Sequence, residues 1–254
     1  MDFSLTEDFI IGSETFRDNH TIEWVILGNN TSVLSDAFRC PLSFKGIIVA
    51  DGASVMFPIS VSIFNDIRSD IEIIIGKNAT VHFARENFTS GNVDARLVNL
   101  EIGDGSTVVF GRSSFNDLTT LKNIKIGENC NLSFGEYSFE DSTTLESLIF
   151  PASTTVTLSA NAFKNCTALK EIFLPSSITS IPANAFVGCT TLESVALMGV
   201  TSIGENAFNA TTDKTLTIFS HANGDLSINS SAFANRASVV LYAMSTNVTS
   251  LSTT

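Results

Sequence analysis

The sequence predicts a β-rich repeat solenoid, one elongated domain of about ten stacked turns that are each 22–27 residues long. Self-similarity at a fixed offset is the first observation behind this prediction. The Asn-Ala-Phe at 161–163 returns 23 residues later at 184–186, and Cys166 returns as Cys189. The aromatic composition is the second, because 20 Phe stand against one Trp and two Tyr. This bias indicates one structural position that Phe fills in turn after turn.

Phenylalanine marks the register of the repeat along the whole chain. The marks are Phe16, Phe38, Phe64, Phe88, Phe115, Phe139, Phe163, Phe186, Phe208 and Phe233. They place the repeats at 16–243, with an N-terminal cap expected at 1–15 and a C-terminal tail at 244–254. The whole chain, 1–254, is thus predicted to form a single repeat domain.

The repeat begins early in the chain and is irregular through the first half. Positions +6, +9 and +11 after Phe16 are apolar, as they are after Phe163: Ile22, Val25 and Leu27, then Leu169, Ile172 and Leu174. Pro41 disturbs the second turn, and about three extra residues follow Phe88. From 115 to 197 the register is regular, and beyond that it drifts.

Each turn is predicted to hold two short strands and a bend. Segment 121–126 exemplifies the first strand and 107–110 the second, since their apolar residues alternate. Glycine, asparagine and proline turn signals, such as those at 103–105, separate the two strands. The Asn-Ala-Phe-x-x-Cys segment is expected to close each turn as a short helical or 3₁₀ bend. Because one turn cannot bury its own apolar face, stacked turns should share parallel sheets and one core.

The repeat unit reads Ala-Phe-x-x-Cys-x-x-Leu-x-x-Ile-x-Leu-Pro-x-x-Ile-Thr-x-Ile, and it closely resembles the BspA-like, or treponemal-type, leucine-rich repeat. The resemblance is strong over 137–208 and weaker over most of the rest. It implies a right-handed leucine-rich-repeat horseshoe. It also implies an extracellular or cell-surface protein of a host-associated microbe that binds matrix or host proteins.

Composition argues against several classes of partner. The net charge of −12 disfavours nucleic acid, because neutralising phosphates needs clustered Lys and Arg. No apolar run of 18 or more residues occurs, so we expect no membrane insertion. Apolar residues make up 44% of the chain and charged residues 16%, which supplies enough apolar material for a long core.

Chemistry-bearing motifs are absent from the sequence. It holds no nucleophile elbow, Walker loop or zinc-protease motif, so we expect no enzyme activity, cofactor or metal site. Cys166 and Cys189 share one position in adjacent turns, and we interpret both as small core fillers. A disulfide or metal site is the alternative, although neither Cys has a partner at metal-ligand spacing. Segment 103–106 is interpreted as a turn, since it lacks the acidic ligands of a calcium loop.

The outward positions of the first strand predict the binding surface. If +9 and +11 point inward, +8 and +10 must point outward. Solvated strands should carry polar residues there, yet these positions include a partly apolar stripe: Trp24, Ile26, Ile74, Lys125, Ile149, Glu171 and Phe173. Such a stripe is a candidate contact surface. The alternative is that neighbouring side chains or a terminal segment cover it.

Two hypotheses of function follow from these residues and from the resemblance. The first is a non-catalytic, adhesin-like module that contacts a host or matrix protein through its sheet face. The second is a structural spacer, or a repeat array that associates weakly with itself inside a larger assembly. A change of the stripe to charged residues would separate them, because only the first predicts loss of a ligand.

Overall fold

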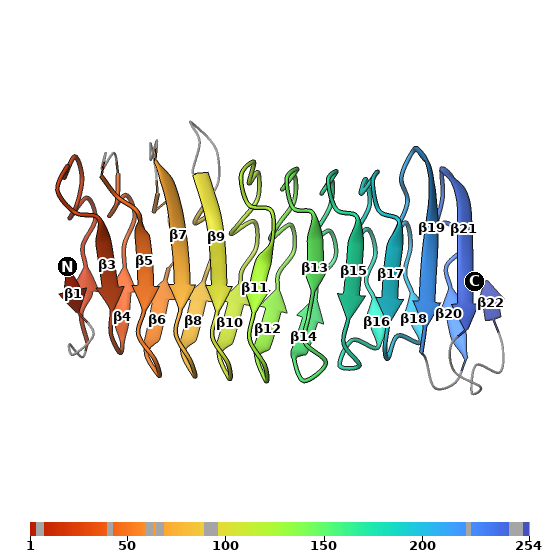
Figure 1. Ribbon diagram of the computed structural model, residues 1–254, viewed down its shortest axis with the longest axis horizontal. Helices are drawn as coiled ribbons and strands as arrows, with labels where there is room; N and C mark the ends of the chain where they lie inside the picture. Colours follow the sequence, from red (N-terminus) through yellow and green to blue (C-terminus); the bar gives the residue numbers. More distant parts are fainter. Residues whose placement is uncertain are drawn as a thin grey trace.

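The computed structural model describes residues 1–3, 8–39, 43–58, 63–64, 69–88, 96–221, 225–243 and 251–253, and these form a row of β-strand turns (Figure 1). The odd-numbered strands are β1 (Asp2–Phe3), β3 (Trp24–Leu27), β5 (Gly46–Val49), β7 (Asp70–Ile75), β9 (Arg96–Ile102), β11 (Ile124–Ile126), β13 (Ser147–Ile149), β15 (Glu171–Leu174), β17 (Ser194–Leu197), β19 (Thr212–Ser220) and β21 (Arg236–Ala243). The even-numbered strands are β2 (Ile10–Ile11), β4 (Thr31–Val33), β6 (Ser54–Phe57), β8 (Thr80–Phe83), β10 (Thr107–Phe110), β12 (Asn131–Phe134), β14 (Thr155–Leu158), β16 (Ser180–Ile181), β18 (Ser202–Ile203), β20 (Leu226–Ile228) and β22 (Leu251–Thr253).

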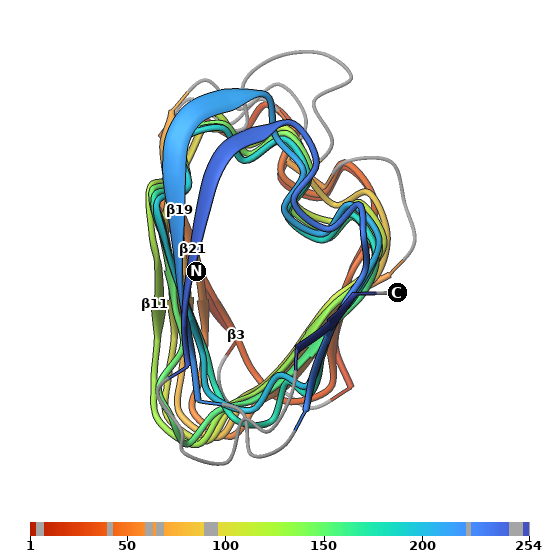
Figure 2. The ribbon, with the colours of Figure 1, turned by 90° about the vertical axis from the view of Figure 1, so that its right-hand side faces the viewer.

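The strands pair in parallel between turns, which confirms the predicted solenoid. The odd-numbered strands form the sheets β1-β3-β5-β7-β9-β11 and β13-β15-β17-β19-β21. The even-numbered strands form the sheets β14-β12-β10-β8-β6-β4-β2 and β16-β18-β20-β22. Viewed along the stack, β3, β11, β19 and β21 all lie toward the same side of the molecule (Figure 2). The odd-numbered strands therefore present one continuous outer face along the molecule.

The number of turns is slightly lower than predicted. In the part of the chain that the structure describes, nine steps lead from β3 to β21, and each step from one odd-numbered strand to the next is one turn. The expected figure of about ten came from counting ten phenylalanine marks, and ten marks enclose only nine intervals.

The bends are hydrogen-bonded turns, and the prediction of helical or 3₁₀ bends is wrong for the residues that the structure describes. Asn161 and Asn165 stand two residues before and after Phe163, with φ of 61° and 58°. A right-handed helix cannot continue through left-handed residues. The Phe163 and Asn165 amides donate instead to the carbonyls of Ala185 and Val187 in the next turn, at 2.9 and 2.7 Å. The bend thus stacks on its neighbour like a strand.

Phenylalanine rings form the spine of the core, as predicted. The rings of Phe139 and Phe163 stack at a centroid distance of 5.4 Å, and those of Phe163 and Phe186 at 5.6 Å. Stacked rings of neighbouring turns extend from Phe16 to Phe233, with a tilted pair in the middle. Because each ring packs between two others, no turn can be removed without exposing aromatic surface.

The cysteines of the repeat are free thiols inside this core, which confirms their interpretation as fillers. Cys166 donates to the carbonyl of Phe139 at 3.3 Å, and Cys189 donates to that of Phe163 at 3.4 Å. Each thiol therefore satisfies a backbone acceptor of the preceding turn. Cys40 lies outside the described residues.

Both ends of the chain take part in the sheets. The segment expected as a cap, 1–15, contains β1 and β2, which pair with β3 and β4. Of the tail at 244–254, residues 251–253 form β22 and pair with β20, while 244–250 and 254 lie outside the described residues.

Candidate binding surface

The outward side of the odd-numbered strands carries all seven residues predicted for the binding surface. In β15, Ile172 and Leu174 are buried, whereas Glu171 is exposed and Phe173 is half-buried between them. The same alternation in β3 buries Val25 and leaves Trp24 half-buried. Strand geometry explains this, because successive side chains point to opposite sides of a sheet. The two halves of the face, however, differ in character.

Apolar side chains continue across the C-terminal half of this face. We call Ile149, Phe173, Ala196, Phe219 and Tyr242 the apolar row, since each is the cross-strand partner of the next. Ile149 is 45% exposed and Tyr242 is 51% exposed. The rings of Phe219 and Tyr242 stack at a centroid distance of 5.5 Å. Five neighbouring strands thus present one apolar line to solvent.

The N-terminal half carries a shorter and more covered apolar run. Ile26, Ile48 and Ile74 are cross-strand partners in β3, β5 and β7, and all three are half-buried. Trp24 lies beside Gly46 in the neighbouring strand. A side chain at Gly46 would clash, because a Cβ there would lie 2.0 Å from the carbonyl oxygen of Glu72. The ring of Trp24 therefore has a neighbour without a side chain.

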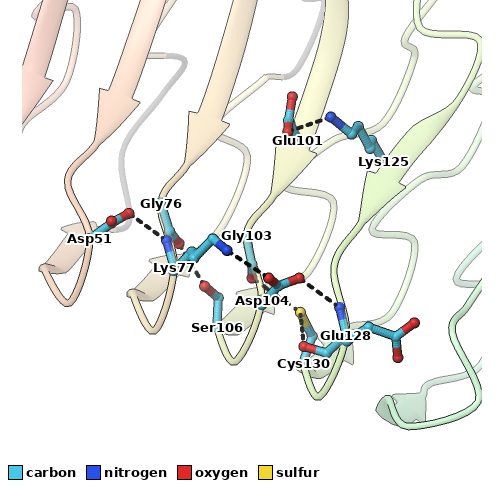
Figure 3. Close-up of polar contacts among 10 residues, drawn as sticks. All are labelled: Asp51, Gly76, Lys77, Glu101, Gly103, Asp104, Ser106, Lys125, Glu128 and Cys130. Carbon is cyan, nitrogen blue, oxygen red and sulfur yellow. Dashed lines mark hydrogen bonds and ion pairs between the residues drawn. The ribbon is translucent and has the colours of Figure 1, made fainter.

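An ion pair separates the two apolar stretches. Glu101 follows Ile74 across the sheet, and Lys125 follows Glu101. The Lys125 ammonium lies 2.6 Å from the Glu101 carboxylate, as Figure 3 shows. The predicted stripe is thus interrupted in the middle, and Lys125 belongs to this interruption rather than to an apolar surface.

Polar side chains form a second line beside the apolar row. We call Asn123, Ser147, Glu171, Ser194 and Thr217 the polar row. Two adjoining depressions are lined by members of this row and share Glu193 and Ser194. Ser147 donates to the Asn123 amide oxygen at 2.7 Å. The depressions are therefore polar at the floor and bordered by the apolar row.

Charged residues border the polar row on its other side. We call Lys122, Glu146, Lys170, Glu193 and Lys214 the charged rim. Glu146 lies 3.2 Å from the Lys170 ammonium and 3.8 Å from that of Lys122. The hydrogen bond from Lys170 holds the pKa of Glu146 below its ordinary value. Lys214 lies 3.3 Å from Glu193, so every lysine of the rim faces a carboxylate.

The turns that follow the odd-numbered strands hold a ladder of polar contacts (Figure 3). Asp104 lies 3.0 Å from the Lys77 ammonium and accepts a bond from the backbone N–H of Glu128 at 3.1 Å. Lys77 lowers the pKa of Asp104, and Asp104 raises the pKa of Lys77. Because these contacts occupy the carboxylate, segment 103–106 is a structural turn, as predicted.

Titratable groups do not converge on a reactive centre in the part of the chain that the structure describes. Within it, no three His, Cys, Asp or Glu side chains are placed to hold a metal ion. None of its residues belongs to a helix long and apolar enough to cross a bilayer. The arrangement as a whole offers shape, apolar area and paired charge, which are the components of a binding surface.

Sequence reasoning missed several apolar members of this face, among them Ile48, Phe219 and Tyr242. Ile48 does stand ten residues after Phe38, but Pro41 made that turn look irregular. Phe219 stands 11 residues after Phe208, and Tyr242 stands nine after Phe233, so the fixed offset skips both. The alternation of buried Leu216 and Ile218 within β19 was the signal that could have placed Phe219 outside.

Comparison with known proteins gives the following similarities. A model described as the BspA type leucine rich repeat region, in six copies, matches residues 59–169 and 109–240, more than half of the chain. The solved structure of a T. pallidum leucine rich repeat protein is 18% identical, with 73% of this chain and 75% of that chain covered and a TM-score of 0.41. A leucine rich cell surface protein of Faecalibacterium prausnitzii is also 18% identical, with 95% and 79% covered and a TM-score of 0.39. No curated protein matches.

Proposed function

This chain belongs to the BspA-type leucine-rich repeat family, and on that premise we propose that it is a non-catalytic protein-binding module. Its binding surface is the outward face of the odd-numbered strands. The observation that carries the proposal is the apolar row, which continues over five adjacent strands from Ile149 to Tyr242. The partner is a host or matrix protein, and the module acts outside the cell or at its surface, as the family resemblance implies.

The apolar row is unusual for a strand face that water reaches. A sheet with one solvated face normally places polar side chains on that face. Here the inward side chains already fill the core, since Ile172, Val195 and Ile218 are all buried. The row is therefore not needed to fill the interior, and contiguous apolar side chains that water reaches in this way mark interaction sites.

A second candidate is a self-associating repeat array. The charged rim favours it, because Lys122, Glu146, Lys170, Glu193 and Lys214 alternate in sign along the face. An alternating line of charges is complementary to a second copy of itself after rotation and a shift of one turn. In that case the apolar row would be the centre of a contact between two identical chains.

The test compares wild-type protein with the double variant Ile149→Lys/Phe173→Glu. Each protein is immobilised, exposed to an extract of extracellular-matrix proteins and scored for captured protein. Met56→Lys is the matched control, because Met56 is 46% exposed on the outer side of β6, in the other sheet series. Melting curves of all three proteins establish that the folds are equivalent.

We expect wild type and Met56→Lys to capture a matrix protein, and the double variant to capture much less of it. Equal capture by all three proteins would contradict the proposed surface. Light scattering distinguishes the second candidate. A dimeric wild type, a monomeric double variant and no capture by either would replace the binding module with self-association.

A further inference from the structure

We infer that the face takes an extended polypeptide segment that places a Lys or Arg on Glu171 and bulky apolar side chains on the apolar row. This inference rests on the proposed function and names the chemistry of the partner. Four features carry it: the charges beside the polar row, the net charge of the chain, the hydroxyl groups of the polar row, and the length of the apolar row.

The charges around the polar row leave a carboxylate for the partner. Lys122 and Lys170 both face Glu146, and Lys214 faces Glu193. Glu171 is exposed in the depression, and its side-chain carboxylate forms no hydrogen bond or ion pair with any residue that the structure describes. An incoming cation therefore meets an uncommitted anion there, whereas an incoming anion meets only lysines that are already paired.

The charge of the whole chain acts in the same direction. Its net charge of −12 attracts positively charged partners over distances comparable to the Debye length, and this raises their association rate. Specificity then comes from the short-range contact with Glu171, because a charged hydrogen bond contributes more than a neutral one. Long-range attraction by the net charge and short-range contact with Glu171 thus both favour a basic segment.

The floor of the polar row suits a main chain. Ser194 and Thr217 offer hydroxyl groups, which both donate and accept hydrogen bonds, and the Ser147 hydroxyl, which donates to Asn123, still accepts. An extended segment carries one N–H and one C=O per residue and needs such partners when it leaves water. Its side chains alternate, so one set lies over the apolar row while the other faces the charged rim.

The length of the apolar row sets the length of the bound segment. Four intervals between neighbouring strands separate Ile149 from Tyr242, which is about 19 Å at about 4.8 Å per interval. An extended chain rises about 3.3 Å per residue, so a segment of about six residues covers the row. Three alternate side chains of such a segment span about 13 Å and can lie between Phe173 and Tyr242, three intervals apart, with a basic residue near one end at Glu171.

The experiment uses random twelve-residue peptides displayed on phage and selected on wild-type protein. Peptides that also bind Ile149→Lys/Phe173→Glu are removed by counter-selection. The selected sequences should combine a Lys or Arg with two or more of Phe, Tyr, Leu and Ile within about six residues. Their synthetic versions should bind Glu171→Gln roughly tenfold more weakly than wild type, since a charge-assisted contact is lost.

Glu205→Gln is the matched control, because Glu205 is an exposed carboxylate on a bend away from the face. It should bind the peptides as wild type does, and raised salt should weaken binding to wild type more than to Glu171→Gln. The inference is overturned if the selected peptides lack a basic residue, if Glu171→Gln binds them unchanged, or if no peptide survives counter-selection. Matrix-protein capture that is still lost in Ile149→Lys/Phe173→Glu would then leave the proposed function standing without this segment.

Discussion

The inner and outer sides of the same strands obey different rules. On the inner side, Ile172 and Leu174 of β15 are matched by Val195 and Leu197 of β17, and all are buried. On the outer side the cross-strand neighbours change along the molecule, from isoleucines in β3, β5 and β7, through the ion pair of Glu101 with Lys125, to the apolar row with its aromatic rings. The inner side must fill one shared core in every turn, whereas the outer side has no such constraint. Apolar residues at outward positions are therefore informative about function, whereas the repeated apolar residues at inward positions are informative about fold.

The largest effect on stability should come from removing an inner ring, and removing an outer ring of the same turn should have a much smaller one. Phe163 is fully buried between Phe139 and Phe186, whereas Phe173 is half-buried on the outer face. Phe163→Ala should lower the free energy of unfolding by about 3–5 kcal/mol, because it leaves a cavity in the stack. Phe173→Ala should cost about 0.2–1 kcal/mol, the range for a cross-strand pair.

Guanidinium-induced unfolding followed by circular dichroism measures both changes. Phe173→Ala also serves as the control for Phe163→Ala, since the same atoms are removed ten residues away. Similar losses in the two variants would contradict the division between inner and outer sides. They would mean that the apolar row holds the turns together and is not reserved for a partner.

Much of the inner side could be predicted from the sequence, and less of the outer side. A repeated Phe every 22–27 residues is sufficient to locate the core, because only buried positions demand the same residue in every turn. The bends were predicted incorrectly because their backbone N–H groups donate to carbonyls of the next turn. The spacing of residues within one turn does not reveal hydrogen bonds between turns. Phe219 and Tyr242 were missed because single-residue slips near the C-terminal end change the offset from Phe while the strand alternation stays intact.

The predicted stripe covers only part of the outer face on which it lies. Its seven residues do lie on one face, but the ion pair of Glu101 with Lys125 divides that face in two. Counting the insertion after Phe88 places Glu101 between Ile74 and Lys125 in the outward series, but it does not show that Glu101 and Lys125 form an ion pair. That the surface binds a partner remains a prediction.

Buried thiols make the inner side sensitive to alkaline pH. Burial raises the pKa of Cys189 from its ordinary 9.0 to about 12. Above pH 9.0 the unfolded chain therefore loses a thiol proton that the folded chain keeps, so stability should fall as pH rises from 9.0 to about 12. The slope from this group is about 1.4 kcal/mol per pH unit. Urea unfolding of wild type and Cys189→Ala at several pH values measures it.

The variant should show a flatter decline than wild type, whatever its absolute stability at neutral pH. Lysine titration contributes equally to both proteins and cancels in the comparison. Parallel curves for wild type and Cys189→Ala would show that the thiol is not held in its neutral form by burial.

Replacing a buried polar side chain beside the inner rings by an apolar one should increase the stability of the protein. Ser138 is fully buried one residue before Phe139, and its hydroxyl has no hydrogen-bond partner among the described residues. Ala162 and Ala185 fill the same position in the next two turns and are also fully buried. Ser138→Ala should therefore raise the free energy of unfolding by about 1 kcal/mol, because an unsatisfied buried hydroxyl is removed. A loss of stability would mean that the hydroxyl is satisfied by water inside the core.

The smallest effect is expected from the charged rim on the outer side. Lys170 and Glu146 are 60% and 40% exposed, and ion pairs between exposed groups add little to stability. Lys170→Met keeps the aliphatic stem and removes the ammonium, so its melting temperature should equal that of wild type within error. A clear drop would assign the rim a role in holding the turns together. An unchanged melting temperature with altered peptide affinity would place the rim in recognition, because it would then affect the outer side alone.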